Sequence, residues 1–232
     1  MWFLLRVAAT AHRAWCLDLT NKSERFSTLE LRDLQRARMF KNDHECHHLA
    51  SWGVEIMQDG PASLDKWDRH DRLRGGKRIF VRILRPVDAA LYPDFLAEVT
   101  AEDMRLRFFA PMRQLRRELI EQLTQLDPAR AAAFAALDED TGKLLGVARL
   151  HYEGGQDGEY AILVRSRLKG LGLGWLLMTQ LVEYARAIGL RQIHGLVLSE
   201  NTAMLKMCGE FGFKVADDAE ERGVKRVTLA LD

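Results

Sequence analysis

Cysteine is scarce in this chain of 232 residues, and its scarcity argues against two kinds of small cross-linked domain. The three cysteines, Cys16, Cys46 and Cys208, are odd in number and form no Cys-x-x-Cys pair. This count and spacing predict neither a disulfide framework nor a zinc module. A reducing compartment suits such a chain best, so we expect a cytoplasmic protein.

The chain also has almost no excess of charge of either sign. Its 34 basic and 33 acidic residues give a formal net charge of +1, and no long basic run occurs. A nucleic-acid-binding surface would require a basic face, so we expect no nucleic-acid partner. The longest apolar runs fall far short of the roughly 20 residues that span a membrane, so we expect no membrane partner either.

Hydrophobic residues make up 47% of the chain, which is enough for the core of one good-sized domain. Composition changes near Gly75 and Gly76, because five of the seven histidines and four of the five tryptophans precede this point. We therefore expect a linker at the two glycines. It would separate an N-terminal extension of unknown role, residues 1–76, from a folded domain over residues 77–232.

The extension is predicted to be helical or irregular. Residues 27–39 read as a helix with Ser27 or Thr28 at its N-cap, and the first fifteen residues read as an amphipathic helix. His44 and His48 could share one helix face. No second ligand group stands at a recognised spacing, so we expect no metal.

From residue 77 onward, apolar periodicity predicts a regular succession of elements. The predicted strands cover residues 78–84, 133–138, 143–152, 158–164, 192–198, 213–215 and 224–231, and the predicted helices cover 86–99, 112–126, 173–188 and 202–211. Residues 139–142 are predicted to form a hairpin turn. The succession indicates a mixed α/β fold.

The most informative segment is the glycine-rich stretch from Lys169 to Trp175, between the apolar run 160–164 and a predicted helix. Small residues let backbone N–H groups approach a phosphate, and the dipole of the helix favours its charge. The glycines fall on every second position, so neither the dinucleotide fingerprint nor the P-loop fits. The segment therefore predicts a different kind of pyrophosphate site.

The pattern Lys169-x-x-Gly172-x-Gly174 resembles the Gln/Arg-x-x-Gly-x-Gly/Ala signature of the GNAT family of acyl-CoA-dependent N-acyltransferases. A second family hallmark follows in the same order: a strand that leads to Asn201, a short helix, and Gly-Phe at 212–213. Within the family, the chain is most similar to Pat-type protein lysine acetyltransferase domains. That likeness is carried by residues 85–88, 106–111, 146–150, 159–166 and 200–205.

The resemblance implies the GNAT fold over residues 77–232: an α/β (α+β) fold with a mixed, mostly antiparallel central sheet flanked by helices. It implies an enzyme, an N-acetyltransferase that uses acetyl-CoA as co-substrate and no metal. It also implies a protein lysine as the acceptor, with an acyl-CoA synthetase as the kind of protein substrate.

The resemblance further assigns the acetyl-CoA site. The strand that ends at Leu163 and Val164 would present backbone N–H groups to the thioester carbonyl, and Asn201 would hydrogen-bond the pantetheine arm. Lys169 or Arg167 would add charge beside the pyrophosphate. The residues implied in acetyl-CoA binding are Leu163, Val164, Lys169, Gly170, Leu171, Gly172, Leu173, Gly174, Trp175, Asn201 and Met204.

Glu159 is the candidate general base, because it lies on the strand that leads to the cofactor, where Pat-type domains carry a glutamate. A carboxylate there could take a proton from a lysine ammonium directly or through water. The alternative is an edge-strand glutamate that faces solvent, and Glu153 and Asp157 are weaker substitutes. The acceptor side is expected to include Arg105, Arg107, Phe108 and Phe109, of which the two phenylalanines are equally compatible with the core.

Many GNAT enzymes carry a tyrosine seven positions after the asparagine, where its phenol can protonate the CoA thiolate. This chain has Cys208 there, which we interpret as a buried structural cysteine. The thiolate would then take its proton from water or from the attacking amine.

Two other functions stay open at this point. One is a small-molecule amine N-acetyltransferase, and the other is a non-catalytic acyl-CoA-binding regulatory module, motivated by the missing tyrosine. An open acidic groove beside Glu159 would favour a protein lysine, whereas a closed pocket would favour a small amine.

Overall fold

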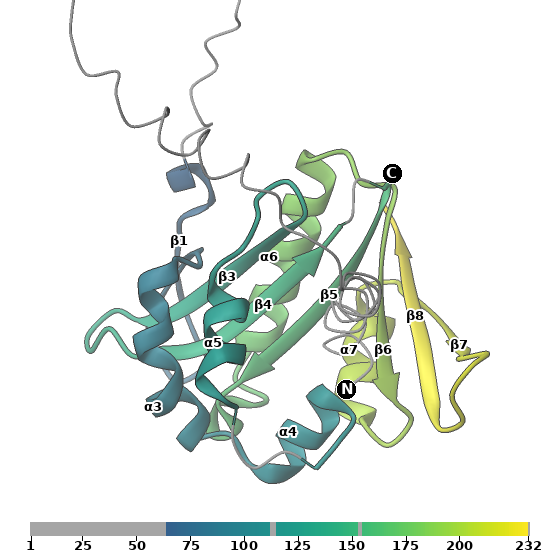
Figure 1. Ribbon diagram of the computed structural model, residues 1–232, viewed down its shortest axis with the longest axis horizontal. Coiled ribbons are helices and arrows are strands. Elements are labelled where there is room, and N and C mark those ends of the chain that lie inside the picture. Colours follow the sequence, from purple (N-terminus) through teal and green to yellow (C-terminus); the bar gives the residue numbers. More distant parts are fainter. Residues whose placement is uncertain (1–63, 112–114, 153–154, 232) are drawn as a thin grey trace, which may run out of the picture. The chain divides into compact units, whose positions relative to one another are not determined.

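One sheet of eight strands, in the order β1-β2-β3-β4-β5-β6-β8-β7, runs through the structure (Figure 1). The computed structural model describes residues 64–111, 115–152 and 155–231. The strands are β1 (Arg69–Arg72), β2 (Arg78–Ile83), β3 (Ala131–Asp138), β4 (Leu144–His151), β5 (Asp157–Val164), β6 (Gln192–Leu198), β7 (Lys214–Asp217) and β8 (Val224–Ala230). Neighbouring strands are antiparallel except for the parallel pair β5 and β6.

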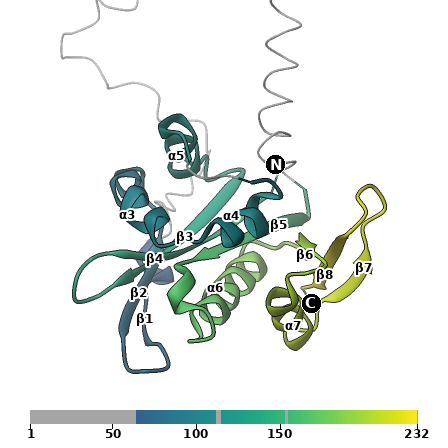
Figure 2. The same cartoon turned by 90° about the horizontal axis from the view of Figure 1, so that it is seen from below.

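Helices cover both faces of the sheet. Helices α3, α4 and α5 lie on one face, and α6 and α7 lie on the other (Figure 2). Their bounds are α3 (Tyr92–Ala97), α4 (Ala101–Phe108), α5 (Arg117–Thr124), α6 (Leu173–Ala187) and α7 (Thr202–Glu210), with short 3-10 helices η1 (Leu64–Trp67), η2 (Pro86–Leu91) and η3 (Ser166–Leu168). Among the described residues, no helix has the length and apolarity needed to cross a membrane.

The burial pattern of the strands follows from this layering. Strand β3 has seven of its eight residues buried, because helices cover both of its faces. Strand β5 alternates instead: Tyr160, Ile162 and Val164 are buried in the core with α6, and the intervening residues are half-buried on the α3–α5 face. A functional side chain at an odd-numbered position of β5 therefore lies on the α3–α5 face.

Most of the predicted elements are present at the predicted places. Strand β6 has the predicted bounds, and α6 is followed by Gly189 with φ of +79°, as expected for a helix stop. The predicted helix 86–99 begins as the 3-10 helix η2 and continues as α3. The predicted turn 139–142 joins β3 to β4.

The structure differs from the predictions in three places. Gly75 and Gly76, expected as a linker, form the tight turn of the hairpin between β1 and β2, where both have positive φ values that favour glycine. Helix α4 was not predicted, and of the described part of the predicted helix 112–126, residues 115 and 116 precede the helix, which covers Arg117–Thr124. The predicted helix 27–39 and the pair His44 and His48 lie outside the described residues.

Candidate active site

The parallel strands β5 and β6 pair only over their first three residues. The paired positions are Asp157 with Gln192, Gly158 with Ile193, and Glu159 with His194. Beyond Glu159, β5 continues to Val164 while β6 continues to Leu198, and no further pair joins them. Beyond Glu159, β5 therefore forms no ladder pairs with β6, and the binding of the thioester by the backbone of Leu163 and Val164 stays a prediction.

Glu159 lies at the last paired position, where the two strands stop pairing. It is half-buried and lies opposite His151 of β4 as well as His194 of β6. Burial lowers the pKa of His194, so its imidazole is largely neutral at neutral pH. The substitute Asp157 is exposed and accepts a hydrogen bond of 2.9 Å from Gln192 Nε2. Glu153 lies outside the described residues, and the role of Glu159 as the base stays a prediction.

The glycine-rich turn leads from β5 into the N-terminus of α6. Gly170 and Gly172 have φ values of +74° and +99°, which glycine adopts readily. Gly172 is the N-cap residue, and its missing side chain leaves the first N–H groups of α6 without a side-chain cap. This arrangement presents N–H donors and a helix dipole, which suits the predicted pyrophosphate site.

The two cations predicted beside the pyrophosphate are bound to acidic side chains of the opposite face. Lys169 Nζ forms an ion pair with Asp103 of α4, and Arg167 pairs with Glu98 after α3. Burial raises the pKa of Asp103, but its bonds from Lys169 and Ser166 outweigh this and hold the pKa below its ordinary value. The structure thus gives Lys169 a partner that the sequence did not indicate.

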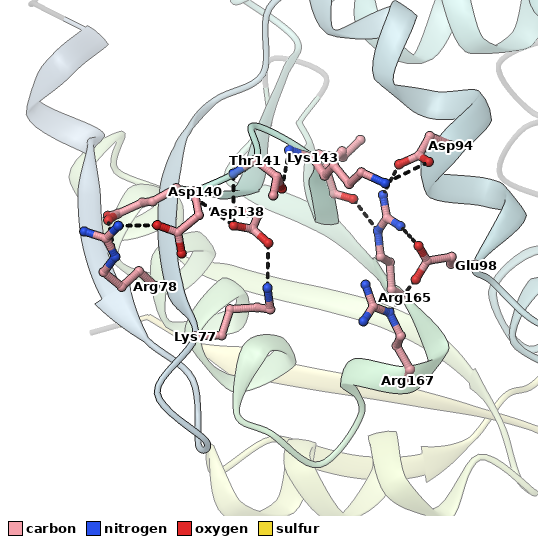
Figure 3. Close-up of polar contacts among 12 residues, drawn as sticks. Lys77, Arg78, Asp94, Glu98, Asp138, Asp140, Thr141, Lys143, Arg165 and Arg167 are labelled. Atoms are coloured by element: carbon pink, nitrogen blue, oxygen red, sulfur yellow. Dashed lines mark hydrogen bonds and ion pairs between the residues drawn. The ribbon is translucent and has the colours of Figure 1, made fainter.

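A fully buried arginine fixes the end of β5 against α3. Arg165 donates 2.6 Å hydrogen bonds to Leu144 O and to Asp94 Oδ2, and it also pairs with Glu98 (Figure 3). Lys143 approaches Asp94 from the hairpin turn between β3 and β4, at 3.5 Å. Arg165 therefore connects the strand that carries Glu159 to the helices on the acceptor face.

The second family segment caps α7. Asn201 Oδ1 accepts a 3.2 Å hydrogen bond from the backbone N–H of Met204. Within the described residues, Asn201 Nδ2 donates no hydrogen bond, so it is available to a ligand. Glu200, one residue earlier, pairs with Arg105 of α4 at 2.6 Å, so α4 is connected to the end of β6 as well.

Trp175 lies in the first turn of α6 and is 43% exposed. Its ring packs on Phe211 after α7 with a centroid distance of 4.1 Å. The predicted acetyl-CoA residues on β5, α6 and α7 thus lie around the ends of β5 and β6, but their contact with acetyl-CoA stays a prediction.

Cys208 is fully buried, in agreement with the interpretation as a structural residue. Its Sγ lies 3.0 Å from the hydroxyl of Tyr160, and burial raises the pKa of the thiol. A thiol with a raised pKa stays protonated and unreactive near neutral pH.

The α3–α5 face, which is the expected acceptor side, carries two arginines, and Arg107 is affected by the charge of Glu159. Arg149 of β4 is buried, and its Nη2 donates to Leu123 O. Burial and the charge of Arg149 lower the pKa of Arg107 to about 10, and the charge of Glu159 opposes this shift only in part. Phe108 is buried, so it belongs to the core, while Phe109 ends α4 with φ of +60°.

Comparison with known proteins gives the family. The model of the acetyltransferase (GNAT) family matches residues 94–213. The chain therefore belongs to the GNAT acetyltransferase family, and the predicted GNAT fold is confirmed. The members of this family are enzymes that use acetyl-CoA as co-substrate.

Three relatives illustrate the likeness. Acetyltransferase PA5475 of Pseudomonas aeruginosa is 29% identical over 155 residues, which cover 65% of this chain and 83% of that protein. Acetyltransferase Pat of Mycolicibacterium smegmatis is 27% identical over 143 residues, which cover 61% of this chain but 43% of Pat. The crystal structure of the GNAT domain of S. lividans PAT superposes with a TM-score of 0.66 at 26% identity, covering 72% of this chain and 98% of that one.

Proposed function

We propose that this protein transfers an acetyl group from acetyl-CoA to the side-chain amine of a protein lysine, with Glu159 as the general base. The observation that carries the proposal is the position of Glu159 at the last pair of β5 and β6. A half-buried carboxylate there stands next to the strand edge that the family uses for the thioester. The likeness to Pat and to the S. lividans PAT domain supports a lysine acceptor.

The chemistry requires few groups from the protein. The neutral amine attacks the thioester carbonyl after Glu159 has taken its proton, a N–C bond forms, and the C–S bond breaks. Backbone N–H groups of β5 would stabilise the charge on the carbonyl oxygen. The bonded nitrogen is cationic and loses its second proton as the amide forms. The thiolate takes this proton or one from water, since Cys208 is buried in the core.

The surroundings of Glu159 bear on the acceptor. Arg107 of α4 lies close enough to Glu159 for the carboxylate charge to affect its pKa, so it adds a positive charge beside the proposed base. A positive charge there does not favour the approach of a lysine ammonium group. For this reason, the lysine acceptor rests on the relatives, and a small amine is the second candidate.

The test measures CoA release and acetyl-CoA binding by Glu159→Gln. Loss of the base should lower kcat by about 100-fold or more, while the Kd for acetyl-CoA stays within about twofold. The matched control is Asp157→Asn on the same strand, which should keep its activity because Asp157 is exposed. The acceptors are an acyl-CoA synthetase, lysine peptides and small amines.

Each result has a clear reading. Full activity of Glu159→Gln would refute the assignment of the base, and loss of activity in Asp157→Asn alone would transfer it to Asp157. A wild-type protein that binds acetyl-CoA and acetylates no acceptor would be the regulatory binding module instead. Transfer to small amines with none to proteins would replace the lysine acceptor by the second candidate.

A further inference from the structure

Basic side chains from two layers of the fold lie on the α3–α5 face that carries Glu159. Arg149 and His151 lie two positions apart on β4, and His151 is paired with Glu159 across the ladder. Side chains two apart on a strand lie on the same face, so Arg149 shares the α3–α5 face with Glu159. Arg107 reaches this face from α4, which contacts both β5 and β6.

The two arginines differ in what they already bind. Arg149 is occupied, since its Nη2 donates to Leu123 O and its guanidinium also interacts with the hydroxyl of Tyr92. Arg107 lies 4.9 Å from the ring centroid of the adjacent Phe108. Within the described residues, its guanidinium donates no hydrogen bond and forms no ion pair shorter than 4.0 Å.

A half-buried guanidinium without a hydrogen-bond acceptor is unfavourable by itself, because it has lost part of its hydration. It becomes favourable when a ligand supplies an anion, and the planar fork of arginine matches a carboxylate in particular. Arg107 also repels an approaching ammonium group, so an acceptor that carries no carboxylate, such as a simple diamine or polyamine, is a poor one.

Resting on the proposed acetyl transfer, we propose that the acceptor is an amine that carries a carboxylate near the reacting nitrogen, and that Arg107 binds this carboxylate. Glu159 takes the proton of the amine while Arg107 holds the other end of the acceptor. The same chemistry occurs in a free amino acid and in a peptide whose lysine is flanked by Asp or Glu.

Binding with matched probes tests the inference without turnover. The probes are a series of N-acetylated amino acids of increasing chain length, from glycine to 6-aminohexanoic acid, each paired with its amide. Each probe is titrated by calorimetry into the full chain saturated with CoA. At least one carboxylate should bind about tenfold more tightly than its amide, the strength of a hydrogen bond to a charged group. Arg107→Gln should abolish this preference.

The control variant is Arg78→Gln on β2, an exposed arginine already paired with Asp140. It should keep the full preference for the carboxylate. Equal binding of acid and amide by the wild type, or a preference that survives in Arg107→Gln, would overturn the inference.

Measuring acetyl transfer then distinguishes the two sources of the carboxylate, which are a free amino acid and an acidic residue beside a peptide lysine. The acceptors are free amino acids, and lysine peptides flanked by either Asp or Asn. Arg107→Gln should raise KM for the carboxylate acceptor about tenfold and leave kcat within about twofold. An arginine that only keeps Glu159 ionised would instead change the rates of all acceptors alike. Absence of any transfer contradicts the proposed function, whereas transfer without preference for a carboxylate contradicts this inference alone.

Discussion

Replacing Gly195 by alanine probes the packing at the point where β5 and β6 stop pairing. Gly195 directly follows the last paired residue of β6, and Tyr160 directly follows Glu159. A Cβ atom at Gly195 would stand 2.8 Å from Cε1 and 3.0 Å from Cζ of Tyr160. Carbon atoms prefer about 3.5–4.0 Å, so the ring has to withdraw by more than about half an ångström.

The ring has little room to withdraw. Tyr160 is 5% exposed, its ring packs edge-on against Phe213 at a centroid distance of 5.4 Å, and its hydroxyl contacts Cys208. Overpacking of this kind costs about 1–3 kcal/mol. We therefore expect Gly195→Ala to lower the free energy of unfolding by that amount, measured by urea denaturation as a lower midpoint with an unchanged slope.

Gly209→Ala provides the matched control. Gly209 lies within α7, and a Cβ atom there would meet nothing within 4 Å. Alanine should stabilise the helix by about 0.5–1 kcal/mol. Tyr160→Leu removes the ring that the new Cβ atom would meet. In this background, Gly195→Ala should lower the free energy of unfolding by clearly less than it does in the wild type. A neutral Gly195→Ala variant, or an equal cost in both backgrounds, would refute the steric reasoning.

Two other outcomes concern buried ionisable groups. Burial raises the pKa of Asp88, but its bonds with Arg82 and the Arg85 backbone outweigh this, so the folded pKa lies below the unfolded value. This contribution to stability is present above about pH 4 and is lost as the pH falls through the lower folded pKa. The midpoint of thermal unfolding should therefore fall less steeply below pH 4 in Asp88→Asn than in the wild type, and equal slopes would contradict the argument. Burial also raises the pKa of Cys208, so this thiol should resist iodoacetamide at pH 8 in the native chain and react after unfolding. Mass spectrometry locates the label, and labelling of Cys208 in the native chain would show that the thiol is accessible.

The sequence predicted those elements whose burial is periodic. Strand β6 buries every second residue, and its predicted and observed bounds coincide. Strand β1 reads Arg-His-Asp-Arg and has no buried residue, so no apolar alternation marks it as the edge of the sheet. Its pairing with β2 depends on tertiary structure, which a local pattern does not contain.

Helix α4 left a different kind of signal. Its N-cap Thr100 accepts a 3.2 Å hydrogen bond from the N–H of Asp103, acidic residues occupy the first turn and arginines the last. These capping and charge features identify a short helix better than its few apolar residues do. Residues 106–111 carry the family resemblance, and this resemblance alone does not predict the helix that carries Arg107.

The partners of the site residues were the least predictable part. Lys169 was assigned from a local motif, yet its observed partner Asp103 lies 66 positions earlier, on the helix that periodicity missed. Ion pairs between distant segments leave no pattern in either segment. The backbone conformation of the glycine-rich turn, in contrast, is local, and the sequence predicted it well.

These ion pairs make the cofactor loop and the acceptor face one connected unit. Helix α4 is tied to the loop after β5 through Asp103 and Lys169, and to the turn after β6 through Arg105 and Glu200. It therefore bridges the two strand ends between which acetyl-CoA is expected to bind, and it carries Arg107. A substitution of Lys169 releases Asp103 as well as changing the charge beside the pyrophosphate. Its effect on acetyl-CoA affinity should consequently be measured together with acceptor selectivity, because α4 carries both Asp103 and Arg107.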